Sequence, residues 1–143
     1  MPSMRFARTV VAAAFCVVGL WVAGCGEKRE AATVSGTVKV AGKPLEGIRV
    51  SFEPVGRGLG QGSAGVTDAA GKFTLIFVDN DRPGALIGKH RVTFFDLKST
   101  PPGESPDAGN LPAVKSRLPA RYLTETLEYE VKAGDNQADF DLK

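Results

Sequence analysis

From residue 33 to the C-terminus, the chain consists of short runs of alternating apolar and polar residues, which end at glycine, proline or aspartate. A period of two places the apolar side chains on one face of a β-strand, and glycine and aspartate favour tight turns. Sustained helical periodicity is absent over any window of about 12 residues, apart from one short turn expected at 118–123. The pattern therefore predicts an all-β domain with seven strands, at 34–40, 48–52, 63–67, 72–77, 90–95, 127–131 and 138–142.

Seven short strands in one domain favour an antiparallel β-sandwich, in which two sheets bury one face each against the other. The strands at 63–67 and 72–77 are expected to pair as a hairpin, and those at 127–131 and 138–142 as a closing hairpin. The predicted core consists of the inward-facing residues Val38, Val40, Ile48, Val50, Phe52, Phe73, Leu75, Phe77, Val92, Phe94, Leu127, Tyr129, Val131, Phe140 and Leu142.

The N-terminal segment has the three parts of an export signal. Arg5 and Arg8 supply positive charge, residues 9–24 are uncharged and mostly apolar, and small residues lead directly to Cys25. The uncharged stretch is short against the ~20 residues that a membrane-spanning helix needs. A cleaved lipoprotein signal is the favoured interpretation. An uncleaved membrane anchor and an ordinary signal with a chance cysteine remain as alternatives.

The run Leu-Trp-Val-Ala-Gly-Cys at 20–25 ends in four residues, Val-Ala-Gly-Cys, that resemble the lipobox of bacterial lipoproteins. This resemblance implies thioether lipidation of Cys25, cleavage before it and acylation of the new amino terminus. The chain then divides into a signal peptide at 1–24, a polar tether at 25–32 and a domain at 33–143. Cys16 would leave with the signal, so the processed chain would have neither a free thiol nor a disulfide.

The charge of the processed chain excludes one class of partner. Without Arg5 and Arg8, 16 basic residues balance 16 acidic ones, and no basic patch stands out. Nucleic acid is therefore not an expected partner. Gly26 follows the cysteine, where an aspartate retains some bacterial lipoproteins in the inner membrane. An outer-membrane or cell-surface location is therefore favoured over the inner membrane.

Three segments carry a second resemblance. Val-Ser-Gly-Thr-Val at 34–38, Gly-Lys-Pro-Leu-Glu-Gly-Ile-Arg-Val at 42–50 and Thr-Asp-Ala-Ala-Gly-Lys-Phe at 67–73 follow one another in this order. Together they resemble the carboxypeptidase regulatory-like domain, a transthyretin-like or immunoglobulin-like sandwich found in small lipoproteins of Planctomycetes-like bacteria. The resemblance implies a passive structural or binding module without peptidase activity.

Candidate ligand sites in the sequence are weak. Asp79 and Asp81 flank an asparagine in a loop and are the candidate metal ligands, for calcium. Asp68 or Asp96 would add a ligand only if the fold brings it near, and the spacing of an EF-hand is missing. Residues 60–65 match G-x-G-x-x-G, but a strand rather than a helix is expected to follow, so no cofactor is predicted. His90, the only histidine, is expected to be a surface or half-buried strand residue, and no catalytic residue is assigned.

Three further features are open to interpretation. Lys39 and Asn136 are the only pair considered for an isopeptide bond, and this is not favoured because Asn136 is expected in a turn. The irregular segment 99–120 holds five of the nine prolines and is predicted to be a surface loop or a partner contact. Tyr122 and Phe95 are the only rings expected to be exposed, so sugar binding is not favoured.

The sequence thus predicts a non-enzymatic, lipid-anchored β-sandwich of the cell envelope with a structural, adhesion or binding role. Its expected partners are the membrane, through the anchor, and an envelope protein or glycan. A calcium-binding or small-ligand module is the first alternative. A transthyretin-like hydrolase is the second, and it is disfavoured because the chain lacks the histidine cluster of those enzymes.

Overall fold

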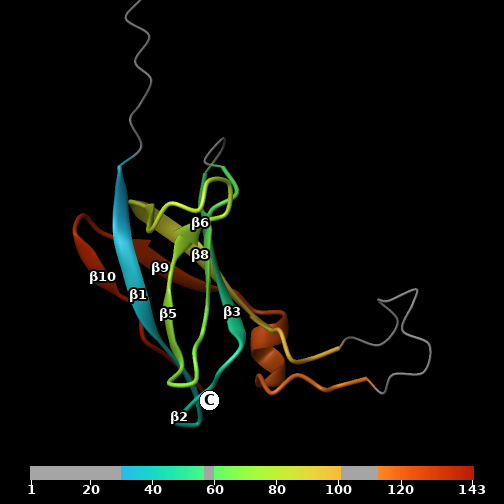
Figure 1. Ribbon diagram of the computed structural model, residues 1–143. Helices are drawn as coiled ribbons and strands as arrows, with labels where there is room; N and C mark the ends of the chain where they lie inside the picture. The colour runs from blue at the N-terminus through green and yellow to red at the C-terminus, as the bar shows by residue number, and fades with distance from the viewer. Residues whose placement is uncertain (1–29, 57–59, 101–112) are drawn as a thin grey trace, which may run out of the picture.

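The computed structural model describes residues 30–56, 60–100 and 113–143 (Figure 1). The predicted signal peptide at 1–24 and Cys25 lie outside the described residues. The described chain is mostly β, with a single short 3-10 helix, which agrees with the all-β prediction. Its elements are β1 (Ala31–Val40), β2 (Lys43–Pro44), β3 (Ile48–Pro54), β4 (Ser63–Val66), β5 (Lys72–Thr74), β6 (Ile76–Phe77), β7 (Ala85–Leu86), β8 (Gly88–Asp96), the 3-10 helix η1 (Ala120–Leu123), β9 (Leu127–Val131), β10 (Asp135–Gln137) and β11 (Phe140–Leu142).

The strands form two sheets. The five-stranded sheet has the order β6-β4-β3-β8-β9, and all of its neighbours are antiparallel. The six-stranded sheet is built around the long strand β1, which pairs in turn with β2, β5, β7, β10 and β11. β1 begins at one end of the molecule, called here the Glu30 end, and the C-terminus lies at the opposite, far end (Figure 1).

The prediction of seven antiparallel strands is corrected in two respects. Eleven strands are present in the described residues, and β1 runs parallel to both β10 and β11. The predicted closing hairpin is wrong, because β9 pairs with β8 whereas β11 pairs with β1 in the other sheet. The predicted hairpin of 63–67 with 72–77 holds only for β6, since β5 pairs with β1.

Leu75 marks the point where the chain changes sheets between β5 and β6. It is fully buried, and its backbone N–H donates to the carbonyl oxygen of Val34 at 2.9 Å. The core lies between the two sheets, so inward-facing side chains point to the same core before and after the chain changes sheets. Every second residue therefore faces the core in β5, at Leu75 and in β6 alike. The alternation therefore predicted the strand residues correctly but could not assign them to a sheet.

The core is one cluster that draws side chains from both sheets. Ten of the fifteen predicted core residues are buried, and the other five (Val40, Phe77, Leu127, Tyr129 and Phe140) are half-buried. Phe52 lies at its centre, with its ring centroid 5.4 Å from that of Tyr129 and 6.4 Å from that of Phe140. The pattern missed Val34, Leu118, Tyr122 and Ala138, which are also buried in this cluster.

Candidate binding site

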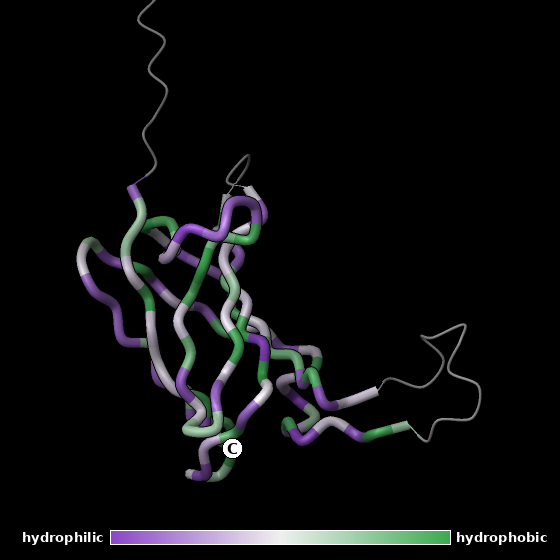
Figure 2. Tube along the Cα trace, viewed as in Figure 1, coloured by the Kyte–Doolittle hydropathy of each residue, from purple (hydrophilic) through white to green (hydrophobic). Residues whose placement is uncertain are grey.

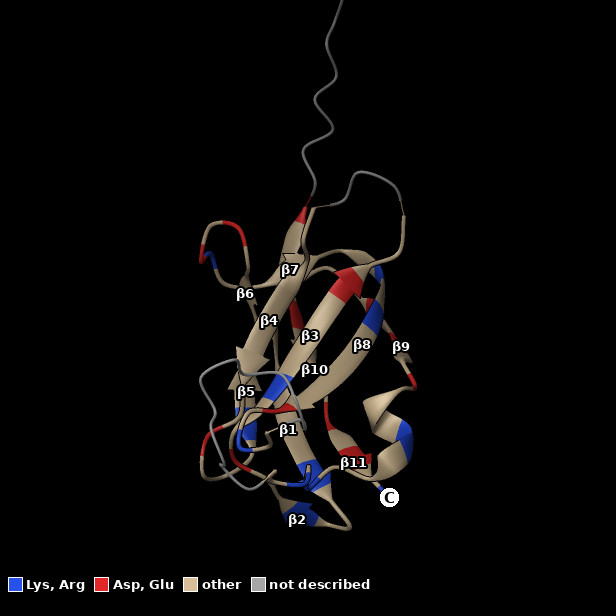
Figure 3. Cartoon of the chain, turned by 90° about the vertical axis from the view of Figure 1, so that its right-hand side faces the viewer, with Lys and Arg blue, Asp and Glu red and all other residues tan. Residues whose placement is uncertain are grey.

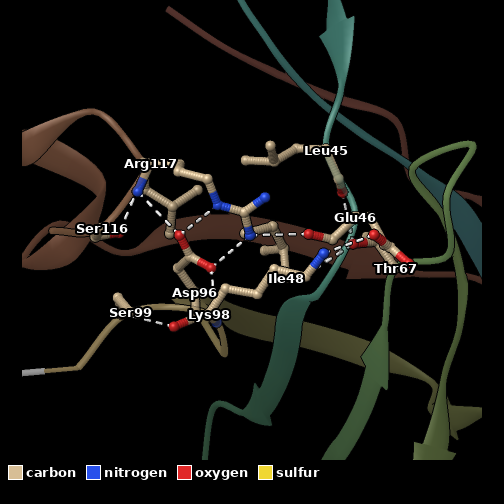
Figure 4. Close-up of polar contacts among 10 residues, drawn as sticks. Leu45, Glu46, Ile48, Thr67, Asp96, Lys98, Ser99, Ser116 and Arg117 are labelled. Carbon is tan, nitrogen blue, oxygen red and sulfur yellow. Dashed lines mark hydrogen bonds and ion pairs between the residues drawn. The ribbon is translucent and has the colours of Figure 1, made fainter. Parts of the chain in front are cut away.

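Asp96 ends β8 at the far end of the molecule and forms the best-defined polar contact of the fold. Its carboxylate is 1% exposed and faces Arg117, whose Nη2 donates to Oδ1 at 2.6 Å and whose Nε donates to Oδ2 at 2.9 Å (Figure 4). The backbone N–H groups of Lys98 and Arg117 donate to the same two oxygens. Each carboxylate oxygen therefore accepts two hydrogen bonds, which offsets the cost of burying the charge.

The electrostatics follow from this geometry. The hydrogen bonds from the Arg117 guanidinium lower the pKa of the Asp96 carboxyl to about 2, while burial acts in the opposite direction. Asp96 is therefore charged at any physiological pH, and the pKa of Arg117 is raised by the same contact. The pair is permanently ionised, which suits an anchor between segments rather than a group that exchanges protons.

Arg117 joins two further segments at this end. Its Nη2 also donates to the carbonyl oxygen of Glu46 at 2.9 Å, and the backbone N–H of Leu97 donates to the carbonyl of Gly47 at 3.0 Å. Beside them, the hydroxyl of Thr67 donates to the carbonyl of Leu45 and accepts from the N–H of Ile48 (Figure 4). The chain before β3, the end of β8 and the segment that leads to η1 are thus tied together by buried or half-buried polar groups.

The contact between Asp96 and Arg117 holds residues 113–123 beside the end of β8. Between them lies a mostly apolar groove of about 470 Å³, whose apolar lining includes Phe94, Phe95, Val114 and Leu123. Leu118 and Tyr122 of the same segment are buried, and the Tyr122 ring lies edge-on to Phe94. The prediction that Tyr122 is exposed is therefore wrong, whereas Phe95 is 48% exposed as expected. η1 confirms the predicted turn at 118–123.

The outer face of the five-stranded sheet, which the other sheet does not cover, has a charged part and an apolar part. Toward the Glu30 end its exposed residues form a ladder of opposite charges across the strands, with Glu53 opposite Arg91, Arg91 opposite Glu128, and Lys89 opposite Glu130. Figure 3 shows these charges gathered at the upper ends of β3 and β8. Opposite charges placed across from one another in neighbouring strands attract each other, and charged side chains suit this part of the face to solvent.

A diagonal part of the same face is mostly apolar, with Arg49 of β3 between its members on β4 and β8. Its apolar residues are Val66, Ile76, Val78, Phe95 and Leu97, which we call the apolar strip, and each of these side chains is at least 41% exposed. With Val114 and Leu123 of the adjoining groove, it accounts for seven of the nine exposed large hydrophobic residues in the described chain. Exposed apolar residues that gather in this way mark interaction sites, whereas scattered ones do not.

The acidic turn that holds the candidate metal ligands lies between β6 and β7 at the Glu30 end, where Figure 2 shows a hydrophilic loop. The side chain of Asn80, between the two aspartates, accepts from the N–H of Arg82 at 3.1 Å and so closes the turn. Across the described ranges no three His, Cys, Asp or Glu side chains converge as a metal site would need. Asp79 and Asp81 are thus not joined by a third ligand there.

The remaining sequence candidates occupy structural positions. The second half of the G-x-G-x-x-G segment at 60–65 already belongs to strand β4, and β5 rather than a helix is the next element of the described chain. Asn136 is not in a turn but in β10, where it lies opposite Val34 and accepts from the N–H of Lys132. Lys39 lies opposite Asp141, five positions farther along β1 and so roughly 16 Å away. The two side chains are too far apart for an isopeptide bond.

His90 is buried, which corrects the expectation of a surface or half-buried residue. It follows the inward phase of β8 with Val92 and Phe94, its exposed fraction is 1%, and its Nδ1 lies 3.0 Å from the carbonyl oxygen of Gly88. Its ring packs against Phe52. Burial lowers the pKa of His90 because it disfavours the charged imidazolium. A histidine in this position contributes to the core and does not face a substrate.

The burial of His90 predicts a pH dependence of stability. Its pKa is lowered in the folded protein from an ordinary value of 6.5, so the unfolded chain binds more protons below that pH. The stability that depends on a neutral His90 is fully present above pH 6.5. It is lost as the pH falls toward the pKa of His90 in the folded protein. We expect the Tm, measured by circular dichroism, to fall between pH 7 and 5. The variant His90→Phe should lack most of this slope, and an unchanged slope would contradict the assignment.

The Asp96–Arg117 pair was not predicted from the sequence, although a signal for it was present. Inward positions of β8 continue from His90 through Val92 and Phe94 to Asp96, so the alternation itself places an aspartate in the interior. A buried carboxylate requires a charged or hydrogen-bonding partner. The sequence does not reveal which cation supplies it, because Arg117 is 21 residues away in an irregular segment.

No protein-family model, curated protein or solved structure shows significant similarity to this chain. Helices in the part of the chain described by the structure are all too short to cross a membrane. Function is therefore inferred from the N-terminal sequence and from the surface just described.

Proposed function

We propose that this protein is an exported, lipid-anchored, non-enzymatic β-sandwich module of the cell envelope that binds a protein partner through its apolar strip. The observation that carries this proposal is the concentration of exposed apolar side chains on one part of one sheet face. An outer-membrane or cell-surface location is part of the proposal, as is membership of the carboxypeptidase regulatory-like, transthyretin-like class.

The anchor is supported by the order of features around Cys25. Positive charge and an apolar stretch precede it, the four lipobox-like residues at 22–25 end in it, and β1 begins only six positions after it, at Ala31. Six residues span at most about 21 Å when fully extended. A lipid on Cys25 would therefore hold the Glu30 end of the domain close to the membrane.

A binding role is supported by the organisation of the outer face. The charged ladder sets opposite charges across from one another, whereas the apolar strip exposes Phe95 and four aliphatic side chains to solvent. Aromatic and aliphatic residues surrounded by polar ones are typical of the centre of a protein interface. The position of His90 in the core also supports a role without acid–base catalysis.

The anchor can be tested with the full chain expressed in a bacterium that processes lipoproteins. An alkyne analogue of palmitate should label the wild-type protein and should not label Cys25→Ser, because that variant lacks the acceptor thiol. Cys16→Ser is the matched control and should be labelled like the wild type. Labelling that persists in Cys25→Ser would overturn the anchor.

A further inference from the structure

The apolar strip borders a groove that carries one charge of each sign. The groove has a volume of about 330 Å³ and is lined by Val66, Ile76, Val78 and Leu97 together with Arg49 and Asp81. Arg49 lies on β3 opposite Val66, and Asp81 lies in the turn beyond β6. Among the described residues, no ion pair engages either of them.

The two charges lie on opposite sides of Ile76. The strand register places Ile76 opposite Ala64, two positions along β4 from Val66, which is itself opposite Arg49. The chain then continues from Ile76 through Phe77 to the turn, where the N–H of Asp81 donates to the carbonyl of Phe77 at 3.0 Å. Along the groove the order is therefore cation, apolar centre, anion.

This order makes the surface complementary to itself. Across a two-fold axis, residue i of one copy contacts residue j of the other and j contacts i, so only residues on the axis itself meet their own counterparts. Consider an axis that lies in the interface, passes through the centre of the groove and runs at right angles to this row of residues. It would place the apolar centres of the two copies against each other, and Arg49 of each copy near Asp81 of the other. A partner with a single sign of charge would leave either Arg49 or Asp81 facing a like charge.

We propose that the partner bound by the apolar strip is a second copy of this chain, which packs face to face across a two-fold axis near Ile76. The inference rests on the proposed function and specifies its partner. Lipid anchoring favours such a dimer, because copies confined to one membrane surface meet at high effective concentration.

Charge reversal tests the pairing of Arg49 with Asp81. The full chain, purified in detergent, is compared by sedimentation velocity as wild type, Arg49→Glu, Asp81→Arg and the double variant. Each single reversal should weaken dimerisation about tenfold or more, because two like-charge contacts arise per dimer. The double variant should recover to within about threefold of the wild type, since opposite charges again face each other.

Arg91→Glu is the matched control, because it makes the same change on the same face within the charged ladder and should leave dimerisation unaltered. Thermal melts verify that each variant is folded. A wild-type protein that stays monomeric at high concentration, or a double variant that dimerises less than either single variant, would overturn the second copy as the partner.

Photocrosslinking separates this inference from the proposed function. A photoreactive amino acid replaces Ile76 in the full chain in living cells, and a second variant carries it at Glu128 in the charged ladder as control. A crosslink from position 76 to the same chain supports both proposals. A crosslink only to a different envelope protein overturns the dimer and leaves the binding role standing. Absence of any crosslink specific to position 76 overturns both.

Discussion

Arg117→Ala is expected to lower the free energy of unfolding by about 3 kcal/mol, the magnitude seen when one partner of a buried ion pair is removed. The variant leaves the Asp96 carboxylate buried at 1% exposure, with only its two backbone donors. Arg117 itself is 36% exposed, so water can enter and partly solvate the carboxylate, which keeps the cost near the lower end of the usual range. Urea unfolding followed by circular dichroism measures the change.

The exposed pair of Lys98 and Glu46 provides the control for this prediction. Their charged atoms are 2.6 Å apart, as in the buried pair, but both side chains are more than half exposed. Lys98→Ala should therefore cost less than about 1 kcal/mol. Equal losses in Arg117→Ala and Lys98→Ala would contradict the view that burial makes the Asp96 contact important.

The same pair predicts the behaviour of the protein in acid. The pKa of Asp96 is lowered from 3.8 to about 2 in the folded state, so its contribution is complete above pH 3.8 and is lost as the pH falls toward 2. This contribution amounts to about 2 kcal/mol, because a tenfold change in proton affinity corresponds to roughly 1.4 kcal/mol. In Arg117→Ala the dependence of stability on pH over this interval should be much weaker.

Gly36→Ala is the second substitution with a large expected effect, about 3 kcal/mol or more of destabilisation from overpacking. A Cβ built on Gly36 would lie 1.8 Å from the carbonyl oxygen of Ala138, far inside van der Waals contact. The neighbouring atom belongs to the backbone and cannot rotate away. Ala138 is also held in place, because its N–H donates to the carbonyl of Ser35 at 2.8 Å.

The physical reason is the crowding around β1. At this level β5 pairs with one edge of β1 through Phe73 opposite Gly36, while the chain between β10 and β11 passes Gly36 at Ala138. We expect Gly36→Ala to lower the Tm strongly in a melt of the purified protein. Ser35→Ala, one position away, should change stability by less than about 0.5 kcal/mol. A Gly36→Ala variant as stable as Ser35→Ala would contradict the close approach.

The strand residues and most of the core could be predicted because alternation is a local property. Val50 and Phe52 on β3, and Val92 and Phe94 on β8, were placed in the core by their period of two, and all four are buried. The assignment of strands to sheets could not be predicted in this way. Val131 and Leu142 were expected in one hairpin, yet they belong to different sheets, because either arrangement directs the same side chains inward.

The candidate site was less predictable than the core. The apolar strip joins β4, β6 and the end of β8, and its members become neighbours only through the register of the sheet. Val66 and Ile76, taken singly in the sequence, look like ordinary strand residues. Arg49 and Asp81 are 32 positions apart, and nothing in their local sequence indicates that they border one groove.

The sequence by itself determined that the described domain is all-β and which strand side chains turn inward, and the residues around Cys25 led to the prediction of an anchor. These conclusions depend on neighbours within a few positions, where the chemistry of the backbone decides the outcome. Only the tertiary structure decided the partner of Asp96, the burial of His90 and the line of apolar side chains on the outer face. Each of these requires contacts between distant segments, which the packing of two sheets creates and local pattern does not contain.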